Sequence, residues 1–72
     1  MASSMIYFFE LFSVSAEGDR RRQLGVMQHH FKALTLAEQY AKAIVKHTVV
    51  KDRKVDLCVI KDKFGKVLSE VR

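Results

Sequence analysis

The sequence has few of the features that usually stabilise very small proteins. Its one cysteine, Cys58, cannot form an internal disulfide, and no cysteine–histidine spacing of a structural zinc site occurs. No proline interrupts any apolar stretch. A chain of 72 residues buries only about 60% of its unfolded surface on folding. Close packing or association with another chain must therefore supply the remaining stability.

Long apolar runs and targeting signals are also absent. No run approaches the roughly 18 apolar residues of a membrane span. The opening MASS carries no basic residue, and the apolar run after it contains Glu10, so no secretory signal is indicated. With a lone thiol, these absences favour a cytoplasmic location. Residues 1–4 are predicted to be a flexible leader and residues 5–72 a single domain.

The N-terminal half predicts two strands. Met5–Val14, MIYFFELFSV, reads as a strand that is apolar on both faces. Glu17-Gly18-Asp19 is a turn signal, because glycine tolerates positive φ and aspartate can bond to its own backbone. Arg21 to His29 then predicts a second strand, hairpinned to the first, with a bulge at Gly25.

A helix follows in TLAEQYAKAIVKH. Thr35 and Glu38 have the spacing of a capping box, in which each side chain bonds to the backbone N–H of the other residue. One face is apolar at helical spacing, and the small alanines on it would let the helix lie close to a sheet. This face consists of Ala37, Tyr40, Ala41, Ile44 and Val45.

The C-terminal third predicts a second hairpin. After a polar connection at Lys51 to Lys54, a strand runs from Val55 to Ile60 and a final strand from Val67 to Val71. Gly65 lies where the turn needs a left-handed residue. The order strand, strand, helix, strand, strand predicts an α+β fold: a four-stranded, mainly antiparallel sheet with one helix packed on one face.

The sequence contains no recognisable catalytic or metal-binding motif. Adjacent histidines in a strand point to opposite faces, so His29 and His30 are unsuited to one metal ion. Cys58, between apolar neighbours, reads as a core residue. Glu10 and Asp56 fit an outward-facing position, or pairing with a cross-strand cation, better than general acid catalysis. The expectation is a protein that is not an enzyme, with no metal, no cofactor and no small-molecule substrate.

One helix would leave the second face of the sheet bare. Tyr7, Phe9 and Leu11, or the opposite set of side chains, would then form an exposed apolar strip. This predicts a non-catalytic interaction module that forms a homodimer or docks to a protein partner through the strip. The alternative within one chain is that the N-terminal residues, Val49-Val50 and long Arg and Lys stems cover the strip.

Nucleic-acid binding is the second candidate function. The chain carries 13 basic and 8 acidic residues, a net charge of +5. Bases could stack on exposed Tyr7, Phe9 or Phe64. The interleaved acidic residues instead favour solvated charged turns. The basic residues proposed to contact nucleic acid are Arg20, Arg21, Arg22, Lys51, Arg53 and Lys54.

The chain resembles a family of very small bacterial proteins that is common among alphaproteobacteria. The similarity is carried by the aromatic strand Tyr7-Phe8-Phe9, by the alanine-containing helix introduced by Thr35, and by the strand–turn–strand with Asp62 and Gly65. The segment from Arg20 to Phe31 departs from the pattern, since it is basic where the family tends to be acidic. This family carries no established activity, so the resemblance implies a fold and no site residues.

Overall fold

The structure is a computed structural model that describes residues 4–18 and 20–72. Most of the predicted leader therefore lies outside the described residues, as does Asp19 of the predicted turn. The elements in chain order are β1 (Met5–Val14), β2 (Arg21–Phe31), α1 (Leu34–His47), β3 (Val49–Val50), β4 (Arg53–Lys54), β5 (Leu57–Lys61) and β6 (Val67–Val71).

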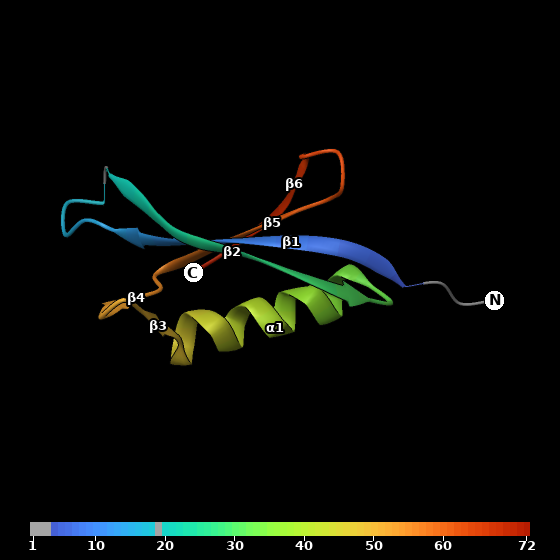
Figure 1. The fold of residues 1–72 in the computed structure, drawn as a ribbon, viewed down its shortest axis with the longest axis horizontal. Coiled ribbons are helices and arrows are strands. Elements are labelled where there is room, and N and C mark those ends of the chain that lie inside the picture. The colour runs from blue at the N-terminus through green and yellow to red at the C-terminus, as the bar shows by residue number, and fades with distance from the viewer. Residues whose placement is uncertain (1–3, 19) are drawn as a thin grey trace.

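Four strands form one antiparallel sheet in the order β2-β1-β5-β6. The helix α1 packs on one face of this sheet, and no helix lies on the other face within the described part of the chain (Figure 1). β1 is central and pairs with both β2 and β5. The predicted α+β fold, with its strand–strand–helix–strand–strand order, is confirmed.

The core lies between β1 and the helix. Tyr7, Phe9 and Leu11 are 3%, 0% and 3% exposed and belong to the cluster of buried side chains that packs against α1. The prediction that these three residues form an exposed strip is wrong, because this is the face of β1 that the helix covers. The side chains that point away from the helix are the opposite set, which begins with Ile6 and Phe8.

The helix approaches the sheet through small side chains. Ala37 and Ala41 are completely buried, and Ile44 is nearly so, which confirms the predicted apolar face. The predicted capping box does not form, since the helix begins at Leu34 with Ala33 as N-cap and without a side-chain cap. Thr35 is thus already inside the helix. Glu38 instead accepts a hydrogen bond from the Ser69 hydroxyl of β6, with an Oγ to Oε2 distance of 2.7 Å.

The bulge in β2 and the left-handed glycine of the last turn are present as predicted, and β2 is longer than predicted. The pairing of β1 with β2 shifts register between Leu11 and Phe12, whose partners are Gly25 and Gln23, so Leu24 is the extra residue beside the expected bulge at Gly25. β2 extends beyond the predicted end at His29, to Phe31. At the last hairpin Gly65 has φ +82°, as the turn requires, and Asp62 Oδ1 accepts hydrogen bonds from two backbone N–H groups of the turn.

The short hairpin β3–β4 was not predicted. Its two turn residues, Lys51 and Asp52, have φ values of 51° and 65°. A two-residue turn with positive φ at both positions normally uses Asn-Gly or Asp-Gly. Since neither residue is glycine, the sequence carries no such signal here, and the left-handed conformation costs about 1–2 kcal/mol for an ordinary residue.

Relieving the backbone strain at Lys51 and Asp52 should stabilise the protein. The double variant Lys51→Asn/Asp52→Gly is expected to raise the free energy of unfolding by about 1 kcal/mol, because both new residues tolerate positive φ. For a domain of this size, that corresponds to a melting temperature about 4–8 °C higher in a thermal scan. Lys51→Ala/Asp52→Ala removes the same charges without relieving the backbone and should give no gain. Equal melting temperatures for the two variants would contradict the assignment of strain.

Candidate nucleic-acid interface

The first basic cluster lies where β1 passes into β2. The turn between these strands is closed by the backbone hydrogen bond from Ser15 N to the Arg20 carbonyl oxygen, at 2.9 Å, and by Gly18, whose φ is +78°. Arg21 and Arg22 then begin β2 and pair with Val14 and Ser13. The three arginines are exposed, and they lie at one end of the sheet.

The second basic cluster is held at the same end by the residues that follow it. Val55 is completely buried, and its N–H donates to the Thr48 carbonyl oxygen. Asp56 is tied to β1 twice: its backbone N–H donates to the Phe12 carbonyl oxygen at 2.8 Å, and its Oδ2 accepts from the Val14 N–H at 3.0 Å. These contacts fix the chain immediately after β4 to the end of β1.

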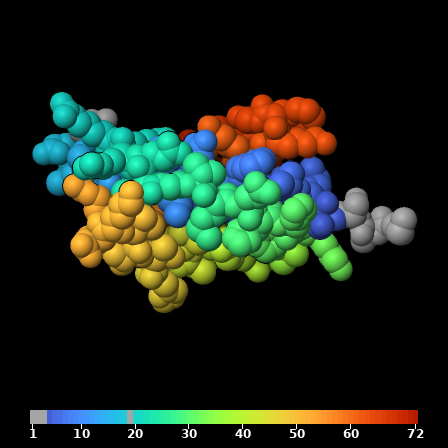
Figure 2. All heavy atoms as spheres, in the orientation of Figure 1, coloured from blue at the N-terminus to red at the C-terminus, as the bar shows by residue number. Residues whose placement is uncertain are grey.

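The two clusters therefore come together. Figure 2 shows the start of β2 and the β3–β4 hairpin side by side at one end of the molecule. Between them is a hollow of about 520 Å³, the basic hollow. Among the described residues, it is lined by five basic residues and one acidic residue, together with Ser13, Val14 and Ser15; the charged residues are Arg20, Arg21, Arg22, Arg53, Lys54 and Asp56.

A second hollow adjoins the first. It has a volume of about 310 Å³ and shares Arg22 and Arg53 with the basic hollow, and Lys51 lies on its wall. All six basic residues predicted to contact nucleic acid thus line two neighbouring hollows. The residues could be predicted from the sequence, but their convergence could not, because it depends on the unpredicted β3–β4 hairpin.

Several cations at this end have no ion-pair partner among the described residues. Among residues 4–18 and 20–72, Arg22, Arg53 and Lys54 form no ion pair, while Arg21 Nη2 lies 3.4 Å from Glu70 Oε1. The carboxylate of Asp56 is already bonded to the Val14 N–H. The basic hollow can therefore attract an anion.

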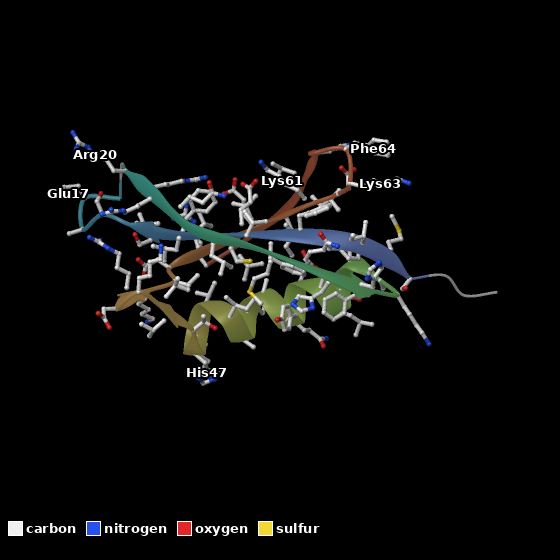
Figure 3. All side chains as sticks on the ribbon, viewed as in Figure 1. Glu17, Arg20, His47, Lys61, Lys63 and Phe64 are labelled. Carbon is white, nitrogen blue, oxygen red and sulfur yellow. The ribbon has the colours of Figure 1, made fainter. Side chains whose placement is uncertain are left out.

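The predicted aromatic contacts are not at this site. Tyr7 and Phe9 are buried beneath α1 and are inaccessible to bases. Phe64 is 83% exposed, but it lies on the β5–β6 turn, while Arg20 marks the opposite end of the sheet (Figure 3). The sequence-based expectation of stacking on Tyr7 and Phe9 is wrong, because alternate residues of β1 point into the core.

The two adjacent histidines diverge as predicted. His29 faces the helix, where its Nε2 lies 2.9 Å from the Tyr40 hydroxyl oxygen, and its ring belongs to an aromatic cluster with Phe9, Phe31 and Tyr40. His30 is exposed on the other face. In the described part of the chain, no group of three or more His, Cys, Asp or Glu side chains could hold a metal ion.

The other residues considered for catalysis, Glu10 and Cys58, have structural roles. Glu10 Oε2 lies 2.9 Å from Lys61 Nζ on the neighbouring strand β5, so of the two expected alternatives the cross-strand ion pair is present. Cys58 is completely buried in the core, as predicted. Burial raises the pKa of the Cys58 thiol from its ordinary 9.0 to about 11. The thiol therefore stays protonated and inaccessible in the folded protein at neutral pH.

Cys58 should make stability fall in alkaline solution. Above about pH 9 the thiol ionises in the unfolded chain but not in the folded one, so the free energy of unfolding decreases until about pH 11. The slope from this group approaches about 1.4 kcal/mol per pH unit. The measurement is urea unfolding of the wild type and of Cys58→Ala at several pH values. Because the two proteins share all other titrating groups, the difference between their free energies of unfolding should change with pH at this slope. Parallel pH profiles for the two proteins would contradict the assignment.

Comparisons of the chain with protein-family models, with curated proteins and with solved structures gave no match. The family resemblance noted in the sequence therefore stays a prediction. Within the described residues, no helix combines the length and the apolar character needed to cross a membrane.

Proposed function

We propose that this protein is a small non-catalytic binding module for nucleic acid, whose phosphate backbone it holds at the basic hollow. The observation that carries the proposal is the convergence of Arg20–Arg22 with Arg53 and Lys54 around one hollow. These two clusters lie far apart in the sequence, and the fold places them at one end of the sheet.

The arrangement favours contact with phosphates over reading of bases. Arginine presents a planar fork of donors that matches phosphate oxygens, and four of the five cations lining the hollow are arginines. No exposed aromatic ring is among its lining residues. Binding should therefore depend strongly on salt and weakly on sequence.

The test is a fluorescence-anisotropy titration in which the full chain is added to a fluorescein-labelled probe. The three probes are single-stranded RNA, single-stranded DNA and duplex DNA. Binding is expected at about 50 mM salt and should weaken at about 200 mM. If about four phosphates are contacted, the slope of log K against log salt should be near −3 for a single strand. The three probes together identify the preferred nucleic acid.

A charge-matched pair of variants separates the site from the overall charge. Arg22→Glu/Arg53→Glu reverses two cations shared by both hollows and should weaken binding by at least about 100-fold at low salt. Lys42→Glu/Lys46→Glu makes the same change in net charge on the exposed side of α1 and should have a much smaller effect. Absence of binding at low salt, or equal losses in the two variants, would overturn the proposal.

A further inference from the structure

The face of the sheet away from α1 has no covering layer in the described residues, and we call it the open face. Side chains along β1 and β5 point alternately to the two faces of the sheet. Every second residue belongs to the core, and the residues between them point to the open face. None of the five that β1 contributes is fully buried. The open face consists of Ile6, Phe8, Glu10, Phe12 and Val14 of β1, Leu57, Val59 and Lys61 of β5, and their neighbours on β2 and β6.

The chain itself closes one end of the open face. Arg21 on β2 and Glu70 on β6 are joined by an ion pair, although these are the two outer strands. The arginine stem therefore crosses the sheet, and Leu57 and Val59 beneath are 0% and 4% exposed. The prediction that long basic stems could cover the strip holds for this end.

The other end stays accessible. Val26 and Val67 are 55% and 48% exposed, on the strands that flank Phe8 and Lys61. Phe8 and Val26 line a hollow of about 230 Å³ there. The turn that carries Phe64 rises on the same side of the sheet, away from α1 (Figure 3).

The charges of the open face indicate what covers it. Two ion pairs lie on it, Glu10 with Lys61 at 2.9 Å and Arg21 with Glu70 at 3.4 Å, and the hollow at its accessible end is also lined by one further acid and one further base, Asp62 and Lys63. The face is therefore neutral, although the chain carries a net charge of +5. A polyanion or an acidic protein would gain little there. A two-fold interface needs a surface complementary to itself, and apolar side chains with equal numbers of acids and bases meet that condition.

We propose that the open face binds a second copy of this chain in a two-fold dimer, with Phe64 at the rim of the interface. Phe64 is the most exposed of the large apolar side chains in the described residues, at 83%. The 31 residues of the four strands, at about 3.4 Å along the strand and about 4.8 Å between strands, give a face of about 500 Å². This is less than the roughly 800 Å² that each partner of a stable complex buries, so the dimer is weak.

Sedimentation velocity of the full chain over a range of concentrations tests the proposal. A reversible monomer–dimer equilibrium is expected, with a dissociation constant of about 10–300 μM. Val26→Lys adds one positive charge per protomer to the neutral face, two in the interface, and should weaken the dimer at least about tenfold. Phe64→Ser should weaken it about three- to tenfold.

Val49→Lys provides the matched control. Val49 is 63% exposed on the β3–β4 hairpin, away from the open face, so this variant should dimerise like the wild type. Circular dichroism confirms that each variant is folded. A monomer at all concentrations up to about 1 mM, or equal weakening by Val26→Lys and Val49→Lys, would overturn the proposal. Nucleic-acid binding by Val26→Lys is measured in parallel, since Val26 lines neither of the two basic hollows.

Discussion

Replacing Phe9 by alanine should remove about 3–5 kcal/mol of the free energy of unfolding, a large part of the protein's total stability. The ring is completely buried between β1 and the helix, and it packs edge-on against Tyr40 and Phe31, with ring centroids 5.3 and 6.0 Å away. Removing a buried phenyl group costs about 3–5 kcal/mol, because it loses apolar burial and leaves a cavity. A domain of this size has a total stability of only about 4–11 kcal/mol.

Urea unfolding followed by circular dichroism measures this effect, and Phe64→Ala is its control. The same chemical change at an 83% exposed side chain should alter the free energy of unfolding by less than about 0.5 kcal/mol. Similar losses in the two variants would show that Phe9 is not part of the core. The contrast also tests which face of β1 the helix covers, the point on which the sequence-based prediction was wrong.

Changing Asp56 should affect stability and binding in opposite directions. Its carboxylate accepts the Val14 N–H at 3.0 Å and joins the chain after β4 to the end of β1. Asp56→Ala should lower the free energy of unfolding by about 1.5–3 kcal/mol, the usual worth of a hydrogen bond to a charged group. The same change removes a negative charge that lines the basic hollow, so nucleic acid should bind more tightly to the folded variant.

Asp56→Asn separates the two effects. The amide oxygen can still accept the Val14 N–H, so most of the stability should return, while the gain in affinity should remain because the negative charge is gone. Urea unfolding and anisotropy titrations on the three proteins measure both quantities. If Asp56→Asn bound nucleic acid no more tightly than the wild type, the carboxylate would not influence an anion in the hollow.

The order of the strands and the helix could be predicted because each of them is marked by residues that lie close together in the sequence. Gly18 and Gly65 mark turns that need positive φ, and alternation after Val55 marks a strand. The apolar face of α1 follows from helical spacing. Each of these features is decided by residues close together in the chain, so the fold class was accessible without knowledge of tertiary contacts.

The faces and the site could not be predicted in the same way. Both sides of β1 are apolar, so the pattern does not show whether Phe8 or Phe9 meets the helix; the packing of Ala37 and Ala41 decides it. The basic hollow depends on a turn at Lys51 and Asp52 that has no glycine to reveal it. Tertiary contacts through Val55 and Asp56 then bring the two basic clusters together.

The place of β1 in the sheet also has a consequence for folding kinetics. β1–β2 and β5–β6 are local hairpins, whereas the pairing of Phe12 with Leu57 joins segments from opposite ends of the chain. Closing a flexible loop of that length costs about 3 kcal/mol of chain entropy before any contact is gained. The docking of the two hairpins is therefore expected to form the transition state, with the helix completing the nucleus that brings them together.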